Sequence, residues 1–221
     1  VMGDWALLNL GQSGGFLDMT AKAGALFRTL DNYTISMYYR VNKATSLSGN
    51  GHFLWAFSTT VANSATSGKY SAYRLNAQRF ANSTGGYNNE VGIEVGGESA
   101  KDEWVHVLYT QKGGAAKLYL NGELAGSSTS MPANTTNFTE AVNYAWIGRP
   151  PFSGDNYLKN THVADIRLYD RVLAATEIAE LALVGSDGIL IEEYCVCISL
   201  CYCSADLGLA VSKFYNELVA K

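Results

Sequence analysis

The feature that most constrains this chain is a strict alternation of apolar and polar residues in short runs that are separated by turn residues. In 34–41 every second position is apolar: Ile35, Met37, Tyr39 and Val41. The same period recurs in 53–57 and in 91–95. A period of two places alternate side chains on opposite faces of a β-strand. The sequence therefore predicts an all-β, antiparallel fold in which each strand has one apolar face, and two packed sheets bury those faces economically.

Further β-rich runs cover 104–111, 117–120, 144–147 and 162–169. Between 117–120 and Glu123 stands Asn121-Gly122, which is the sequence of a two-residue β-hairpin turn. After Tyr169 the spacing becomes helical, and we expect a short helix over 172–183 that stops at Gly185. The sequence then changes again, with a strand or hairpin expected at 189–203 and an amphipathic helix at 205–220. We therefore divide the chain into a β-sandwich domain, 1–183, and an atypical appendage, 184–221.

Several strings resemble one known family when they are taken in order. The opening strand 31–39 and the segment 103–107, with its W-x-H-V pattern, come first. They are followed by the L-Y-x-N-G string of 118–122, by Ile-Gly-Arg at 147–149, and by a closing strand with a short helix from Asp165. In this order the strings resemble laminin-G-like modules of the concanavalin A-like lectin/glucanase class, and most closely the modules appended to polysaccharide-degrading enzymes of Bacteroidetes. The resemblance covers about 15–183 and implies a two-sheet jelly roll.

The resemblance also implies a function, which is a non-catalytic, lectin-like domain that binds a polysaccharide or a surface glycan outside the cell or at its surface. In such a site aromatic rings stack on sugar faces, and polar side chains bond the hydroxyls. The chain has 14 tyrosines, and any one of them can instead serve packing. We take an outward-facing set and a loop set as candidates: Tyr38, Arg40, Tyr73, Arg74, Tyr87, Asn88 and Asn89.

Calcium is the one candidate cofactor, the alternative being none, because relatives often hold one ion between an N-terminal loop and the closing strand with carboxylate and carbonyl oxygens. Asp165 matches the aspartate of the family's closing strand, and Asp4 is its candidate partner from the opening segment. The alternative is that Asp165 forms an ion pair with Arg167 or Arg149.

The same fold class includes glycoside hydrolases, so that a catalytic carboxylate pair has to be considered. Glu90, Glu94 and Glu98 share a strand face at four-residue spacing, about 13 Å apart on a regular strand. Hydrolysis requires roughly 5–5.5 Å with retention or 6.5–9.5 Å with inversion. We therefore expect a solvated strand face and no enzyme, with a hydrolase as the weakest alternative. The G-x-S-x-G letters at 11–15 lack the strand–turn–helix context of a nucleophile, and His106 is expected to be a packed or rim histidine.

All four cysteines fall within one short run: Cys195, Cys197, Cys201 and Cys203. Their spacing does not match the usual zinc knuckles, which leaves cross-strand or cross-chain disulfides and plain buried thiols open. An apolar, β-branched segment of this kind has to be covered, either by the following helix or by a partner's sheet. The second function class is therefore a structural or adhesive surface subunit that self-associates through 189–221.

The composition argues against two further kinds of partner, a nucleic acid and a membrane. Only 16% of the residues are charged, the net charge is −4 and no basic cluster exists, which argues against nucleic acid. No run of eighteen apolar residues exists, so that no membrane span is expected. Val1 is not an initiator methionine and no signal-like segment follows it, which suggests a chain that begins after processing or was cut from a larger one. Four N-x-S/T sequons, at Asn32, Asn82, Asn134 and Asn137, are what chance gives in so polar a sequence.

Overall fold

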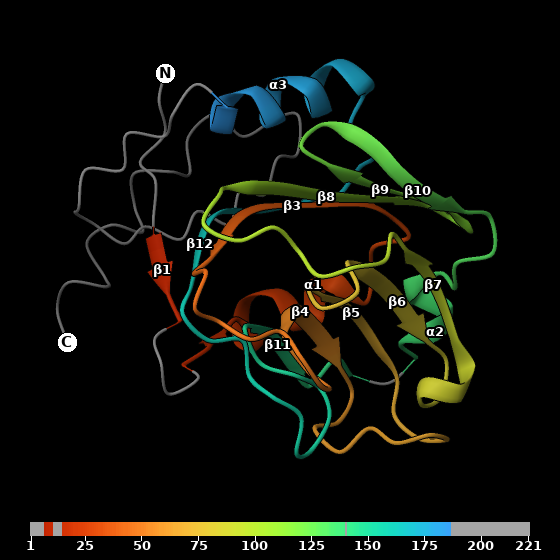
Figure 1. Cartoon of the computed structure of the whole chain (residues 1–221). Coiled ribbons are helices and arrows are strands. Elements are labelled where there is room, and N and C mark those ends of the chain that lie inside the picture. Colours follow the sequence, from red (N-terminus) through yellow and green to blue (C-terminus); the bar gives the residue numbers. More distant parts are fainter. Residues whose placement is uncertain (1–6, 11–14, 140, 187–221) are drawn as a thin grey trace, which may run out of the picture.

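The computed structural model describes residues 7–10, 15–139 and 141–186, and it shows two antiparallel sheets packed face to face (Figure 1). Sheet A has the strand order β1 (Leu7–Asn9), β12 (Thr161–Tyr169), β3 (Asn32–Val41), β8 (Val105–Lys112), β9 (Ala115–Leu120) and β10 (Glu123–Ser128). Sheet B has the order β2 (Leu17–Asp18), β11 (Tyr144–Ile147), β4 (Phe53–Ser58), β5 (Tyr70–Arg74), β6 (Arg79–Ser83) and β7 (Glu90–Glu94). The helical segments within these described residues are η1 (Thr20–Gly24), α1 (Ala25–Phe27), η2 (Tyr87–Asn89), α2 (Asn134–Asn137) and α3 (Ala175–Ser186). The predicted jelly-roll sandwich is confirmed.

The alternating apolar residues form the core between the sheets, as the sequence predicts. Ile35, Met37, Tyr39 and Val41 of β3 all belong to one buried cluster. Aromatic rings link the two layers: Phe27 stacks on Phe57 with centroids 3.9 Å apart, and Phe80 stacks on Tyr109 at 3.6 Å. A void beneath η1 measures about 10 Å³ and is apolar, which is about the least space that one water needs. This part of the interior therefore has no room for a ligand larger than one water, and a glycan would have to bind at the surface.

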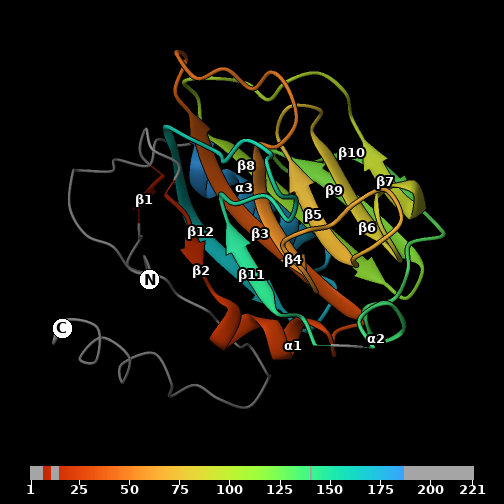
Figure 2. The same ribbon diagram turned by 90° about the horizontal axis from the view of Figure 1, so that it is seen from below.

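One end of the core is polar, and three of the four sequons lie there. Asn82, Asn134 and Asn137 are buried, and each amide nitrogen donates to a backbone carbonyl. The bond from Asn134 to Phe27 O (3.0 Å) joins α2 to α1, and both helices lie at the same end of the sandwich (Figure 2). These three asparagines therefore hold loops in place and are closed to modification in the folded chain, whereas Asn32 is exposed.

The Asn121-Gly122 turn forms the predicted hairpin between β9 and β10, with Leu120 opposite Glu123. Both turn residues have positive φ, 50° and 81°, as a type I′ turn requires. Asn121 also bonds His106 twice, through its backbone N–H to His106 O and through Oδ1 from His106 N, at 2.8 Å each. The turn is therefore attached to β8 as well as to its own strands.

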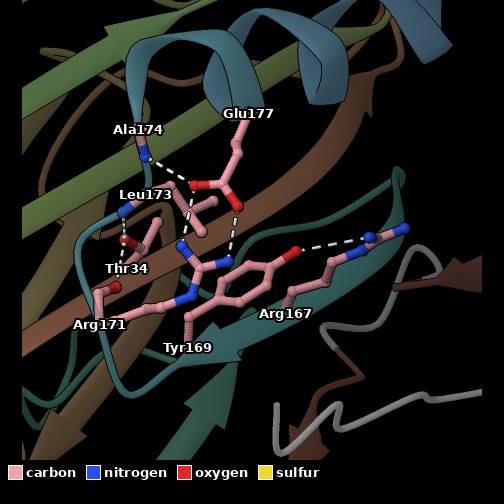
Figure 3. Close-up of polar contacts among 7 residues, drawn as sticks. All are labelled: Thr34, Arg167, Tyr169, Arg171, Leu173, Ala174 and Glu177. Carbon is pink, nitrogen blue, oxygen red and sulfur yellow. Dashed lines mark hydrogen bonds and ion pairs between the residues drawn. The ribbon is translucent and has the colours of Figure 1, made fainter. Parts of the chain in front are cut away.

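The helix α3 lies across the outer face of sheet A (Figures 1 and 2). Its Ile178 packs with Leu173, Leu108 and Tyr169 in a second buried cluster. The helix begins at Ala175 and ends at Ser186, three residues later at each end than the predicted 172–183. The cause of the late start is local, because Glu177 caps the N–H of Ala174 at 2.8 Å and thereby sets the first turn (Figure 3).

Several predictions concern parts of the chain outside the described residues. These are Asp4, positions 11–14 of the G-x-S-x-G string, and the whole of 187–221 with its four cysteines. The predicted appendage and its self-association therefore stay predictions. In the part of the chain that the structure covers, no helix combines the length and the apolar character that crossing a membrane requires.

Candidate functional site

The structure separates the predicted binding residues into three places. Tyr38 is 2% exposed on the outer face of sheet A, where its hydroxyl donates to Leu181 O of α3. Tyr73 is fully buried in the core and stacks on Trp55 at 4.9 Å. Tyr38 therefore faces outward from the sheet as expected, but α3 covers it. The expectation that Tyr73 faces outward is wrong, because its ring points into the core between the sheets. Arg40 and Arg74 are half-buried on opposite sheets and do not meet.

The remaining three residues, Tyr87, Asn88 and Asn89, are exposed and form η2 in the β6–β7 loop. Backbone bonds clamp this helix onto the β4–β5 loop: Tyr87 N donates to Ser64 O and Asn88 N to Ala65 O, both at 2.9 Å. Gly86 makes the close approach possible, since its φ is +74° and a Cβ there would lie 2.4 Å from Ser64 O. The loop therefore presents η2 in one defined orientation.

The ring of Tyr87 is 55% exposed and stands beside a second aromatic residue, Phe152, at 6.2 Å. Phe152 comes from the β11–β12 loop and packs on Tyr70 (5.1 Å) and Phe53 (5.9 Å) on the outer face of sheet B. The loop is held there by Asn63, whose Nδ2 donates to Pro151 O at 2.7 Å. All three loops lie on the side of the molecule away from α3 (Figure 1).

Phe152 finds room because the middle of sheet B carries small side chains on its outer face. Ala56, Ala72, Ala81 and Gly92 stand opposite one another across four neighbouring strands. Ala56 and Ala72 belong to the cluster that Phe152 covers. Phe152 is not among the binding residues predicted from the sequence. The available signal was an aromatic residue after Pro150-Pro151 in a polar loop, but pairing it with Tyr87 required the register of distant strands.

Charged residues lie beside these rings on β6 and β7. Arg79 forms ion pairs with Glu90 and with Glu94 (3.1 Å), and its guanidinium lies over Gly92. Glu90 also accepts the hydroxyl of Tyr70, whose pKa is raised by burial and by this carboxylate. Glu94 and Glu98 are exposed and Glu90 is half-buried. The expectation that all three share one strand face is wrong for Glu98, because β7 ends at Glu94. One arginine therefore neutralises both carboxylates of this strand.

A pocket of about 210 Å³ opens between the β4–β5 loop, the β6–β7 loop and the segment that contains α2. It is lined by Lys69, Thr84, Pro132, Ala133, Thr136 and Asn137. The Nδ2 of the buried Asn137 donates to Ser83 O at 3.0 Å, and its Oδ1 has no hydrogen-bond partner among the described residues. We call this pocket, together with Tyr87, Asn88, Asn89 and Phe152, the rim site.

Asp165, the candidate calcium ligand, lies at a bulge of β12 with φ +51°. Its carboxylate accepts Arg167 Nε at 2.5 Å, which is the ion pair given above as the alternative. Arg149 instead lies over the rings of Trp146 and Phe16, at 4.0 and 4.6 Å. Within the described residues no group of three Asp, Glu, His or Cys side chains is arranged to hold a metal. The described residues thus offer calcium one carboxylate that is already paired, and the site stays a prediction.

Comparisons with known proteins agree with this architecture. Residues 14–179 match a laminin G-type profile described as the concanavalin A-like lectin/glucanases superfamily. The sequence matches no curated protein.

Among solved structures, the CBM40 of the Ruminococcus gnavus IT-sialidase, bound to α2,3 sialyllactose, is 15% identical with a TM-score of 0.61, and the match covers 81% of this chain and 96% of that one. Domain 4 of an extracellular arabinanase from Geobacillus stearothermophilus, in complex with arabinotriose, is 16% identical with a TM-score of 0.52, over 69% of this chain and 67% of that one. The botulinum neurotoxin serotype G binding domain is 16% identical with a TM-score of 0.51, over 81% of this chain and 42% of that one.

These structures are similar to the chain in fold. The family match covers most of the chain. The two sheets, the closing strand and the helix of the chain are those that the family resemblance in the sequence predicts. The chain belongs to the concanavalin A-like lectin/glucanase superfamily, as a laminin G-type member.

Proposed function

We propose that this chain is a non-catalytic carbohydrate-binding module and that it binds a glycan at the rim site. The observation that carries the proposal is the pair of neighbouring aromatic rings, Tyr87 and Phe152, on two loops that are both hydrogen-bonded to the β4–β5 loop. Similar folds that are described in complex with sialyllactose and arabinotriose support a glycan as the ligand.

The physical basis of binding would be stacking and hydrogen bonding. Tyr87 offers an exposed ring face to the apolar face of a sugar, and the amides of Asn88 and Asn89 can bond hydroxyl groups on either side. Because η2 is clamped to the β4–β5 loop by backbone bonds, little ordering entropy is lost when a ligand binds.

The carboxylates near the rim site support the absence of a catalytic role in this proposal. Glu90 and Glu94 both form ion pairs with Arg79. A hydrolase needs one carboxylic acid and one carboxylate across the scissile bond. Turnover of a glycan by the chain, with loss of that turnover in Glu94→Gln, would contradict a purely binding function.

Location and calcium complete the proposal. A module that binds polysaccharide or surface glycans acts outside the cell, and we propose this location for the chain. Calcium bound through Asp4 and Asp165 would require Asp165 to exchange Arg167 for the ion. Thermal unfolding with calcium and with a chelator tests this part, and an identical midpoint in both would contradict it.

The binding test compares two variants that truncate equally exposed side chains. Tyr87 and Leu124 are both 55% exposed, and Leu124 lies on β10 of the opposite sheet. After a glycan array has identified a ligand, Tyr87→Ala should weaken binding about tenfold, since a truncated aromatic anchor costs roughly 1–2 kcal/mol. Leu124→Ala should bind as the unchanged chain does. Equal affinity in both variants, or an array without any bound glycan, would overturn the proposal.

A further inference from the structure

The rim-site pocket combines chemical groups that Tyr87 alone does not supply. Lys69 contributes a cation, Thr84 and Thr136 contribute exposed hydroxyls, and the rest of the lining is an amide with the apolar surfaces of Pro132 and Ala133. A surface that only stacks sugar rings has no need of a lysine in the lining of a pocket. We propose that the pocket binds a sugar residue that carries a carboxylate, with Lys69 as the group that pairs with the carboxylate. The inference rests on the proposed function, and it specifies the class of glycan.

The size of the pocket fits one sugar residue rather than a chain. Its volume is about 210 Å³. Pockets for drug-sized ligands have roughly 300–1,000 Å³. A single ring can therefore enter this pocket, while the next residues of a glycan would remain outside it.

The hydrogen-bonding groups of the pocket match a hydroxylated anion. Lys69 Nζ has three donors and uses one of them toward Thr139 Oγ1 at 3.3 Å. No carboxylate among the described residues forms an ion pair with Lys69. Asn137 Oδ1 is a buried acceptor without a described partner, which a sugar hydroxyl could satisfy after a small side-chain movement. A neutral sugar would satisfy the hydroxyl and amide groups but would bring no counter-charge to the ammonium, which has none among the described residues.

The pocket and Tyr87 are built on the same two loops. Lys69 follows Gly68, whose carbonyl accepts Gly86 N at 2.6 Å, and Thr84 N donates to Asn89 O at 3.3 Å. One glycan could therefore place its acidic residue in the pocket and its neighbouring residue against Tyr87. The chain as a whole carries a net charge of −4 and gives no general attraction for anions. A preference for acidic sugars would thus have to come from this local arrangement.

The experiment uses two sugars that differ only in the carboxylate, methyl glucuronide and methyl glucoside, with binding measured by NMR titration. The unchanged chain should bind the glucuronide about fivefold more tightly, which is what one partly exposed ion pair contributes. Lys69→Met should reduce the ratio of the two affinities to about one, whereas Lys69→Arg should keep it. Lys117→Met, at an exposed lysine on the outer face of sheet A, is the matched control and should also keep the ratio.

A second variant tests whether the pocket itself is used. Thr136 is exposed, so Thr136→Val should fold normally, and it should weaken the binding of both sugars if their hydroxyls enter the pocket. Equal affinities for the two sugars in the unchanged chain, or a ratio that survives Lys69→Met, would overturn the inference. Binding of glycans that depends on Tyr87 but shows no acid preference would overturn the inference alone. No binding of any sugar would overturn both the inference and the proposed function.

Discussion

Glu177 accepts hydrogen bonds from both terminal guanidinium nitrogens of Arg171, at 2.8 and 2.6 Å (Figure 3). This ion pair joins the segment that follows β12 to the first turn of α3. The segment between them is attached to β3 as well, because the hydroxyl of Thr34 donates to Arg171 O and accepts Leu173 N. The start of the helix is therefore determined by contacts with the sheet, in addition to its own sequence.

The same pair makes the start of α3 sensitive to acid. The hydrogen bonds from Arg171 and from the Ala174 N–H lower the pKa of Glu177 from 4.5 to about 2. A lowered folded-state pKa adds stability that is complete above about pH 4.5 and is lost as the pH falls through about 2. In Arg171→Met the Glu177 carboxyl should titrate closer to 4.5, as followed by NMR of its side-chain carbon. An unchanged titration would show that the ion pair does not form in solution.

His106 is expected to make the sandwich less stable in mild acid. Burial, with a smaller contribution from the charge of Arg167, lowers its pKa to about 4. The neutral ring is bound to Ser36 through Nε2 at 2.8 Å. Because the folded pKa lies below the ordinary 6.5, stability is complete above pH 6.5 and falls between pH 6.5 and 4, by roughly 2–4 kcal/mol.

Chemical denaturation across that pH range measures the loss. His106→Gln cannot become protonated, so its unfolding free energy should vary less with pH than that of the unchanged chain. Equal slopes in the two proteins would contradict the assignment to His106.

Gly86→Ala should disrupt the loop that carries Tyr87. A Cβ at this position would lie 2.4 Å from Ser64 O, with φ at +74°. Gly97 is the matched control, because it has a φ of +71° and nothing within 4 Å of its Cβ position. Both substitutions carry the conformational cost of a left-handed residue, about 1 kcal/mol, and only Gly86→Ala adds the clash.

Thermal unfolding and glycan affinity separate these two effects. We expect Gly97→Ala to lower stability slightly with unchanged binding, and Gly86→Ala to lower stability more and to weaken binding. If both variants bind glycan as the unchanged chain does, the clamp on η2 is not needed for the site.

Gln111 should be among the most sensitive positions of the polar core. Its Oε1 accepts the hydroxyls of Tyr33 (3.1 Å) and Tyr109 (2.7 Å), and its Nε2 donates to Gly113 O and Pro132 O at 2.9 Å each. Gln111→Met leaves these buried groups without partners and should cost about 2–5 kcal/mol in urea denaturation. Tyr109→Phe removes one hydrogen bond together with its donor hydroxyl, so it should lower the unfolding free energy less than Gln111→Met does. A loss below about 1 kcal/mol for Gln111→Met would show that water replaces the lost bonds.

Much of the fold could be predicted because its signals are local. Alternation in 34–41 identifies the core face of β3, since a strand with a buried face has to repeat with period two. Asn121-Gly122 predicts its hairpin because few residue pairs accept two positive φ angles in succession. The helix ends were less accurate, because the cap of α3 depends on Glu177 reaching back to Ala174 and on Arg171, which lies between β12 and the helix.

The site was predicted only in part. Tyr87, Asn88 and Asn89 could be selected as a polar loop, and their exposure agrees with that prediction. Tyr73 could not be oriented from sequence, because Tyr70 and Tyr73 of one strand stand on opposite faces and either could have faced the core. Asp165 could be assigned to calcium or to an arginine, and its pairing with Arg167 depends on a bulge that the spacing does not reveal.

The residue pattern alone specified two apolar-faced β layers, their turns and a flanking helix, since backbone preference and side-chain periodicity act over a few neighbouring positions. The three-dimensional packing settled which faces remain open to a ligand. Tyr38 is closed off by a helix more than a hundred residues away, and Lys69 meets Thr84 and Asn137 around one pocket only because three loops converge. Such arrangements depend on which elements cover each other, and no local spacing in the chain encodes them.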